Sequence, residues 1–501
     1  MITESALASK ISDGTRVLIL GAGFAGMSAA NSLCDNVRRG GENGATNVEI
    51  VMVDQKNYQL YTPFLFKSAT GLVDPDHIAQ PVRPKARKKG FDFVEAKVKS
   101  IDLPSKSVFT TAGKIAYDYL IIALGSVKDD AKMHGAEKNS IPLKTLEDSE
   151  QIHNRIIYSF EKASLLEHDN PERSVLLTFV VIGGTTGVEL AGSIYDYINL
   201  IAKDYPQIDV HSEAKVMVIE AHDRLFPEGD KSLSDDVKQT MEKRGIEIRV
   251  NTKVMSIEPS MVKIQDGSSI QSANIFWNAG IKANPVADTI PDSVASKHRG
   301  RIVVDDHLRV PNFQEVYVIG DVSAALASPE PRVSSREVAK SPDAAKHQVD
   351  HKSSGEKKSV SAHRGRYAPP TAEAAVEEGS YVGRDLALRL YNNSENEVDA
   401  TKSAKPFRFK EKGVMLSIGR HNGLVKFTHS TFKGYLGWLI WRLVHVALVS
   451  TMQDKISVIF DWTFGSFRKR NISQFAVPGE AIENIVGSNS SGRETLVEQE
   501  N

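Results

Sequence analysis

Residues 16–26, RVLILGAGFAG, run from a short apolar strand through three glycines into a helix. Gly21 allows a tight turn, Gly23 lets a pyrophosphate approach the backbone, and Gly26 lets the helix pack on the strand. The free N–H groups and the dipole at the helix N-terminus favour an anion. A second strand, VEIVMVD, ends at Asp54, whose carboxylate is placed to accept ribose hydroxyls. A lone glycine motif is a weak signal, but strand, helix and acid in this order predict a dinucleotide site.

A second unit of the same kind follows along the chain. The strand LLTFVVI leads into a turn with three glycines, Gly183, Gly184 and Gly187. A helix is expected to open at Thr186, and the strand KVMVIE ends at Glu220. Ile182 stands where such a turn usually has its first glycine, so a degenerate copy that no longer binds nucleotide is the alternative. The Glu220 carboxylate can pair with ribose hydroxyls and would repel the additional phosphate of NADPH, which predicts a preference for NADH.

Length and composition limit the classes of protein. A chain of 501 residues predicts two or three domains. The net charge of −1 gives no overall positive field, which argues against nucleic acid as a partner. Cys34 is the only cysteine, which excludes an intramolecular disulfide, a dithiol redox pair and a cysteine-built metal site. The first ten residues lack the pattern of a secretory signal, so a cytoplasmic location is the expectation.

Two acidic residues have two interpretations each. Further apolar stretches lie at 117–125, 272–280 and 315–321, and each is expected to be a strand that leads into a glycine. The last of them leads into Gly320–Asp321, which is either a common turn or an acid that binds flavin hydroxyls. Glu189, in the helix after the second glycine turn, is either a partner of the helix dipole or a group that positions the nicotinamide and handles protons.

Part of the chain does not have the composition of a folded core. From 327 to 368, Ser, Pro, Lys, Arg and His replace large aliphatic residues, which predicts a disordered basic insertion. His347 and His351 within it have the spacing of metal ligands on a helix, but a solvated loop is favoured, and no metal site is predicted. A helix is expected after Pro370, and a polar tail from 487 onward.

The segment 431–470 is rich in tryptophan and phenylalanine. A membrane span over 434–452 is disfavoured because Arg442 and His445 interrupt a short apolar run. Helices in the plane of a membrane surface fit better, and Arg468–Arg470 would meet anionic lipid. The aromatic residues expected at the headgroup boundary are Trp438, Trp441, Trp462, Phe460, Phe464 and Phe467. The alternative is a helical pair that closes a homodimer, and the two are compatible.

Motifs along nearly the whole chain resemble those of the type II NADH dehydrogenases, the single-subunit NADH:quinone oxidoreductases. They are GAGFAG, DQKNYQLYTPFLFKSATG, YDYLIIALGS, PLKTLEDSEQ, GGTTGVELAG, WNAG, VYVIGD, PPTAEAAVEEG and the Trp-rich C-terminal part. NYQLYTPFLF and WLIWRLVH are the specific ones, because many flavoproteins share the glycine turns. The resemblance implies an α/β fold of the disulfide-reductase type, with two Rossmann-like dinucleotide-binding domains, one for FAD and one for NADH, and C-terminal amphipathic helices that associate with a membrane.

The resemblance also implies the reaction and its setting. Hydride would pass from NADH to FAD, and electrons would then pass to a membrane quinone without proton pumping, as in electron transport of a respiratory chain. The protein would be a peripheral homodimer on the cytoplasmic face of the cell membrane. The expected organisation is an FAD domain at 1–148, 285–326 and 369–395, an NADH domain at 149–284, the insertion at 327–368, a membrane-association region at 396–486 and a tail at 487–501.

The resemblance supplies the site residues. Those expected to bind the cofactors are Gly21, Gly23, Phe24, Ala25, Gly26, Asp54, Gln55, Thr62, Pro63, Val98, Ala123, Gly125, Gly183, Gly184, Thr186, Gly187, Glu220, Ala279, Gly280, Gly320, Asp321 and Ala372. The expected catalytic residues are Glu189, Glu373 and Glu377. At the last two positions the family usually has glutamine, and an ionised carboxylate only accepts hydrogen bonds, so the quinone side differs from the family.

Other classes of flavoprotein share this architecture. A sulfide:quinone oxidoreductase or a disulfide reductase needs redox cysteines beside the flavin, which one thiol cannot supply. A soluble NADH:acceptor flavin reductase is one alternative. A nucleotide-binding, redox-sensing flavoprotein with little turnover is the other.

Overall fold

The computed structural model describes residues 14–40, 47–129, 133–226, 231–327, 367–392, 405–427, 430–449, 452–464 and 472–473. Contacts divide the chain into two compact units. The first unit is Met1–Asn57, Val82–Ser126 and Ala283–Glu411, and the second is Tyr58–Pro81, Val127–Lys282 and Lys412–Asn501. These units assign 58–81 and 127–148 differently from the domain limits expected from the sequence, which remain a prediction. Almost all of the predicted insertion, with His347 and His351, and the whole predicted tail lie outside the described residues.

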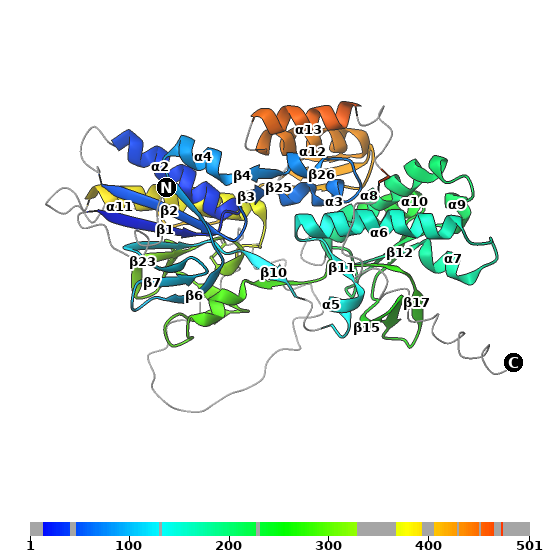
Figure 1. Cartoon of the computed structure of the whole chain (residues 1–501), viewed down its shortest axis with the longest axis horizontal. Helices are drawn as coiled ribbons and strands as arrows, with labels where there is room; N and C mark the ends of the chain where they lie inside the picture. The colour runs from blue at the N-terminus through cyan, green and yellow to red at the C-terminus, as the bar shows by residue number, and fades with distance from the viewer. Residues whose placement is uncertain are drawn as a thin grey trace, which may run out of the picture. The chain divides into compact units, whose positions relative to one another are not determined.

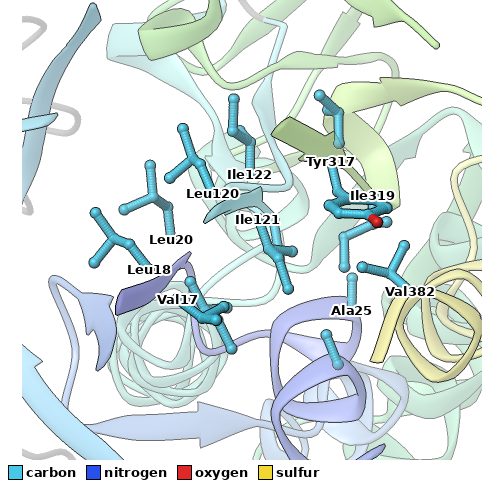
Figure 2. Packing of buried hydrophobic residues seen from close by; sticks show 14 of the residues in the cluster. Val17, Leu18, Leu20, Ala25, Leu120, Ile121, Ile122, Tyr317, Ile319 and Val382 are labelled. Carbon is cyan, nitrogen blue, oxygen red and sulfur yellow. The ribbon is translucent and has the colours of Figure 1, made fainter. Parts of the chain in front are cut away.

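The first unit is built on a six-stranded sheet in the order β22-β23-β9-β1-β2-β5, which is parallel except between β22 and β23. Its strands are β1 (Thr15–Leu20), β2 (Val48–Asp54), β5 (Asp92–Glu95), β9 (Tyr119–Ile122), β22 (Arg309–Val310) and β23 (Phe313–Val318). The inner strands are nearly continuous apolar runs because parallel strands are covered on both faces. Figure 2 shows side chains of β1, β9 and β23 gathered with Ala25 and Val382 in the buried core.

Two helices lie side by side on this sheet, α2 (Phe24–Gly40) and α11 (Ala372–Asn392) (Figure 1). A Cβ on Gly379 would overlap the Ala25 carbonyl oxygen, so this position must be glycine for the helices to approach this closely. The Ser28 hydroxyl donates to the Val376 carbonyl at 2.7 Å. The helix predicted after Pro370 is therefore α11, and it packs on the helix that follows the first glycine turn.

Smaller elements complete the first unit. They are α4 (Val82–Lys89), the antiparallel sheet of β6 (Val98–Asp102), β7 (Ser107–Thr110) and β8 (Gly113–Ala116), and the sheet of β20 (Lys297–His298), β21 (Arg301–Val303) and β24 (Ser323–Ala324). The chain passes from one unit to the other after Asn57, after Pro81, within β10 (Ser126–Lys128), within β19 (Ile281–Ala283) and after Glu411.

The second unit contains a five-stranded parallel sheet in the order β11-β18-β12-β13-β14. Its strands are β11 (Ile141–Pro142), β12 (Thr178–Ile182), β13 (Lys215–Ile219), β14 (Glu247–Arg249) and β18 (Asn274–Trp277). The helices of this part are α5 (Ala136–Asn139), α6 (Leu146–Ser164), α7 (Pro171–Leu176), α8 (Gly184–Ile201), α9 (Val210–Glu213) and α10 (Lys231–Lys243). A three-stranded antiparallel sheet is formed by β15 (Val254–Glu258), β16 (Met261–Ile264) and β17 (Ser269–Gln271).

The predicted start of one helix is wrong by two residues. Helix α8 begins at Gly184 and not at Thr186. Gly183 and Gly184 both have positive φ, +81° and +69°, so the turn is completed before Thr186 and the helix begins directly from it.

The second unit also contains the segment 58–81 and the C-terminal elements. Segment 58–81 forms β3 (Tyr58–Leu60), α3 (Leu65–Ser68) and β4 (Ala79–Pro81). The C-terminal elements are β25 (Gly413–Ser417), β26 (Gly423–Phe427), β27 (Thr431–Lys433), α12 (Gly434–Leu448) and α13 (Met452–Phe464). Within the described ranges, no helix combines the length and the apolar character needed to cross a membrane.

One predicted surface aromatic is in the interior. Trp441 on α12 is 1% exposed and was expected at a headgroup boundary. It packs against Phe64, Phe66 and His445, with ring centroids 5.7, 6.0 and 4.2 Å away, respectively. The prediction failed because the amino-acid type alone does not show which face of a helix meets the rest of the unit.

Candidate functional site

The first glycine turn has the shape of a phosphate cradle. Gly21 has φ +105°, and a Cβ there would overlap the Ala123 carbonyl oxygen. A Cβ on Gly26 would overlap the Gly21 carbonyl oxygen, so strand and helix meet only with glycine at both positions. A Cβ on Gly23, in contrast, would meet no other part of the chain within 4 Å, and the residue is exposed. The turn therefore leaves space at the N-terminus of α2, which fits the pyrophosphate of a dinucleotide.

Asp54 ends β2 beside this turn. Its carboxylate accepts the Ala22 N–H at 2.6 Å and the Lys56 N–H at 2.9 Å. Burial raises the pKa of Asp54, and these backbone donors oppose that rise. A carboxylate has about four acceptor positions, so Asp54 retains capacity for ribose hydroxyls. The geometry fits the role predicted for it.

A second acidic group lies where β23 ends. Asp321 follows Gly320, which has φ +73°, and accepts the Ser126 hydroxyl at 2.5 Å. The Gly320 N–H donates to Glu378 of α11 at 2.6 Å. Glu378 is 1% exposed, and burial raises its pKa to about 8, with Arg301 acting in the opposite direction. The sequence did not single out Glu378, since its burial depends on α11 packing against the end of β23.

A Glu378→Gln substitution should weaken the loss of stability that occurs as the pH rises from about 5 to about 8. The pKa of Glu378 in the folded protein is above its ordinary value of 4.5. Protonated Glu378 therefore makes its full contribution to the stability of the folded protein below about pH 4.5, and this contribution is lost as the pH rises through about 8. Glutamine stays neutral and can still accept the Gly320 N–H. The free energy of unfolding should therefore fall less between about pH 5 and about pH 8, by about 1–4 kcal/mol.

The measurement for this substitution is chemical unfolding followed at both pH values. Glu95→Gln, at an exposed position of β5, is the matched control and should leave the pH dependence as it is. Equal pH dependence of the Glu378→Gln variant and the unsubstituted protein would contradict the assignment.

The second glycine turn repeats the arrangement of the first. A Cβ on Gly183 would lie 2.6 Å from the Ala279 Cβ, so glycine is required where β12 leads into α8. Glu220, which directly follows β13 and is 7% exposed, accepts the Gly184 N–H at 3.4 Å and the His222 N–H at 3.0 Å. An acid that accepts from its glycine turn is the relation seen between Asp54 and Ala22. This likeness disfavours a merely degenerate copy.

Glu189 lies on α8, beyond its first turn. Its carboxylate accepts the Ser417 N–H of β25 at 3.0 Å. Burial raises the pKa of Glu189 to about 8, with the Ser417 N–H and the charge of Lys67 opposing that rise. A carboxyl that is hydrogen-bonded to another element and titrates near neutral pH is suited to proton handling, and a dipole partner alone needs neither property.

Thr62 and Pro63 lie in a short 3₁₀ helix, Thr62–Phe64, that precedes α3. The neighbouring Phe64 ring packs against Trp441 and Trp462, with centroids 5.7 and 5.4 Å away. The segment with Thr62 and Pro63, which the resemblance places among the cofactor-binding residues, is thus packed against α12 and α13 within the second unit.

The structure groups the other expected residues by unit. Those in the first unit are Phe24, Ala25, Gln55, Val98, Ala123, Gly125, Ala372, Glu373 and Glu377, and those in the second are Thr186, Gly187, Ala279 and Gly280. Ala123 backs the Gly21 turn, whereas Val98 is buried in β6. Glu373 and Glu377 lie one turn apart near the N-terminus of α11, both partly exposed. In the part of the chain that the structure describes, no cluster of three or more potential ligand side chains could hold a metal.

The cysteine has no redox partner. Cys34 is 3% exposed on α2, and burial raises its pKa to about 11. It is a packed core residue and not a reactive thiol.

Two nucleotide cradles in one chain define a class of flavoprotein, and comparison with known families agrees. The family model for the pyridine nucleotide-disulphide oxidoreductases matches residues 15–358, and the chain belongs to this family. It is 26% identical to a probable NADH dehydrogenase of Dictyostelium discoideum, over 93% of this chain and 92% of that protein. It is 25% identical to the type II NADH:quinone oxidoreductase Ndh of Mycobacterium tuberculosis, over 89% of this chain and 87% of that protein.

Solved structures agree on the fold. NDH2 from Plasmodium falciparum, in complex with NADH, superimposes with a TM-score of 0.75 at 20% identity, covering 92% of this chain and 99% of that one. The sulfide:quinone oxidoreductase of Aquifex aeolicus gives a TM-score of 0.63 at 18% identity, covering 89% of this chain and 93% of that one. The α/β fold with Rossmann-like parallel sheets is confirmed.

Proposed function

We propose that the chain is a non-proton-pumping NADH:quinone oxidoreductase. Two glycine turns, each with an acid at the end of the next strand, are the observation that carries the proposal, because they provide for two dinucleotides, FAD and NADH. When bound, FAD supplies the hydride acceptor and the electron donor to a quinone. The names of the relatives from Dictyostelium and Mycobacterium support this reaction.

The residues of the chain have separate tasks in this reaction. The turn at Gly23 binds the FAD pyrophosphate. Asp54 binds ribose hydroxyls of FAD, and Asp321 binds hydroxyls of its flavin part. The turn at Gly183 and Glu220 bind NADH. Reduction of a quinone by NADH consumes one proton in addition to the hydride. Glu189, whose pKa is about 8, can hold that proton at its carboxylate near neutral pH.

The anaerobic reaction with NADH tests the proposal. NADH should bleach the flavin absorbance of the purified holoenzyme within milliseconds to seconds, and a ubiquinone or menaquinone analogue should then restore it. Reduction followed by reoxidation with soluble acceptors only would favour a soluble NADH:acceptor reductase. Reduction with no reoxidation by any acceptor would favour a redox-sensing flavoprotein. Protein that retains no flavin, or whose flavin stays oxidised, would refute the proposal.

NADH should be preferred to NADPH. A carboxylate at Glu220 repels the additional phosphate of NADPH, so kcat/KM should favour NADH by about tenfold or more, which is about 1.4 kcal/mol. Glu220→Gln removes the charge at nearly constant size and should bring the ratio toward one. Glu242→Gln, on the exposed side of α10, is the control and should keep the ratio. Equal specificity constants for both coenzymes in the unsubstituted enzyme would contradict the role of Glu220.

We also propose that α12 and α13 bind the surface of a membrane. Their outer side chains form an apolar face, defined here as Tyr435, Leu436, Leu439, Leu443, Leu448, Met452, Ile456, Ile459 and Phe460, each at least 36% exposed. Polar groups of α12 are directed elsewhere: the Arg442 guanidinium lies 4.4 Å from the Trp438 ring centroid and 4.3 Å from that of Trp462. An exposed apolar face on short helices is typical of in-plane association, and a lipid-soluble quinone would reach the enzyme there.

Three finer expectations belong to the same proposal. The acceptor side includes Glu373 and Glu377, whose carboxylates would accept hydrogen bonds from a quinol. The enzyme is a homodimer in which the apolar face is available to lipid or to a second copy. Its location is the cytoplasmic face of the cell membrane, as a peripheral protein.

A further inference from the structure

A lysine lies in the interior of the second unit, where an ammonium group is costly. Lys67 on α3 is 4% exposed. Its Nζ is 4.7 Å from the centroid of the Phe66 ring and 5.7 Å from that of Trp441. Nζ also donates to the Ser193 hydroxyl at 3.4 Å. Among the described residues, no carboxylate forms a direct ion pair with it.

The helix face that Lys67 meets includes two acids. Ser193 follows Glu189 by four residues, and Asp196 follows it by seven, so all three lie on one face of α8. Helix α3 packs against α8, and the contact of Nζ with Ser193 places the ammonium along this row. Lys67 is therefore a neighbour of both carboxylates without touching either.

The two acids differ in their other partners. Asp196 forms an ion pair with Arg244 and accepts the Arg420 N–H, so another cation already neutralises its charge. Within the described part of the chain, the neutral Ser417 N–H is the only hydrogen-bond donor to Glu189. Among the described residues, Lys67 is the cation whose charge favours ionised Glu189. The electrostatic effect of Lys67 is thus most consequential at Glu189.

We propose that Lys67 is a positioning residue that sets the protonation of Glu189, by holding a positive charge beside it in the packed interior of the second unit. Its consequence for turnover rests on the proposed NADH:quinone activity, while its effect on Glu189 does not. Burial lowers the pKa of Lys67 to about 8, and burial raises that of Glu189 to about 8. Lys67 and Glu189 thus exchange protons with solvent over the same pH range, and each stabilises the charged form of the other.

Other groups around Lys67 do not replace this coupling. The charged groups that act on Lys67 are Asp196, Glu189, Arg244 and Arg442. The positive charges of the two arginines disfavour the ammonium form of Lys67, and the arginines do not titrate near neutral pH. The histidines on the packed helices α6 and α12 are His153 and His445, and burial lowers the pKa of both, that of His445 to about 4. Near neutral pH, Glu189 and Lys67 are therefore the pair that changes charge.

Infrared difference titration of the holoenzyme tests the proposal without NADH or quinone. The carboxyl stretch of Glu189 is identified by its loss in Glu189→Gln. In the unsubstituted protein this band should disappear as the pH rises through about 8. In Lys67→Gln it should disappear about one pH unit higher or more, because the nearby positive charge is gone. Lys67→Arg should restore the original titration, and Lys238→Gln, at a partly exposed position of α10, should not change it.

Turnover provides a second readout. The pH at which kcat changes should move upward in Lys67→Gln together with the infrared titration, while KM for NADH stays constant. A Glu189 band that titrates equally with and without Lys67, or that moves as far in Lys238→Gln, would overturn the inference. A shifted band in an enzyme that does not reduce quinone would refute the proposed function and leave the coupling standing.

A second variant and a reciprocal measurement test the inference even if Lys67→Gln does not fold. Lys67→Met gives a second neutral variant. In addition, Glu189→Gln should lower the pKa of Lys67 below about 8, followed by NMR of isotope-labelled lysine, since linkage between two charges is mutual. A Lys67 titration that does not respond to Glu189→Gln would also overturn the inference.

Discussion

A Gly23→Ala variant should fold but bind FAD poorly. The methyl group of the alanine would meet no other part of the chain within 4 Å, so the apoprotein has no reason to lose stability. The same methyl group would occupy the space left for the pyrophosphate at the N-terminus of α2. Overpacking by one methyl costs about 1–3 kcal/mol, which corresponds to roughly a tenfold to hundredfold higher Kd. Flavin absorbance per protein after purification, and titration of the apoprotein with FAD, measure the effect.

Two other glycine substitutions make this result specific. Gly26→Ala places the methyl group on the Gly21 carbonyl and should reduce both folding and flavin content. Gly187→Ala, in the second turn, would place its Cβ 3.2 Å from a Val181 methyl and should retain the flavin. If Gly23→Ala binds FAD with unchanged affinity, the pyrophosphate does not lie on this turn.

Leu443→Glu combined with Ile456→Glu should release the protein from membranes. Both residues belong to the apolar face of α12 and α13 and are 64% and 61% exposed, so their substitution leaves the interior of the unit intact. Loss of two large aliphatic side chains from the lipid boundary costs about 3 kcal/mol or more, which lowers partitioning more than a hundredfold. Flotation with liposomes that contain anionic lipid measures the bound fraction.

Leu165→Glu is the matched control for this face. Leu165 is 82% exposed at the end of α6, outside the apolar face, and its substitution should not affect flotation. If the double variant still floats but changes from dimer to monomer in solution, the face is an interface between two copies. If it still floats and its oligomeric state is unchanged, α12 and α13 do not provide the membrane contact.

The parts of the fold that could be predicted are those encoded by neighbouring residues. The unit from Thr15 to Asp54 needs an apolar strand, three glycines at fixed spacing and an acid after the next strand, and all of these can be read along the chain. The same holds for the strand that leads to Asp321. Each of these elements forms near its expected position because its main determinants, strand burial and turn conformation, are local.

The sequence could not reveal groups whose properties depend on distant segments. Glu378 has an altered pKa because α11 places it against Gly320. Lys67 has one because α3 packs against α8 and its own side chain lies beside Trp441 of α12. Trp441 was expected at the surface because tryptophan is common at membrane boundaries, but its side of α12 faces Phe64 and Phe66. In each case the residue type was visible, but its surroundings follow from tertiary packing.

The contact between α2 and α11 has a consequence for biosynthesis. The helix that follows the first nucleotide turn is covered by a helix about 348 residues later, through Gly379 and the hydroxyls of Ser28 and Ser32. During translation, a nascent chain that ends before Ala372 would leave this small-residue surface of α2 uncovered. Stable uptake of flavin should therefore wait until most of the polypeptide has left the ribosome, even though the turn that receives it is among the first parts to emerge.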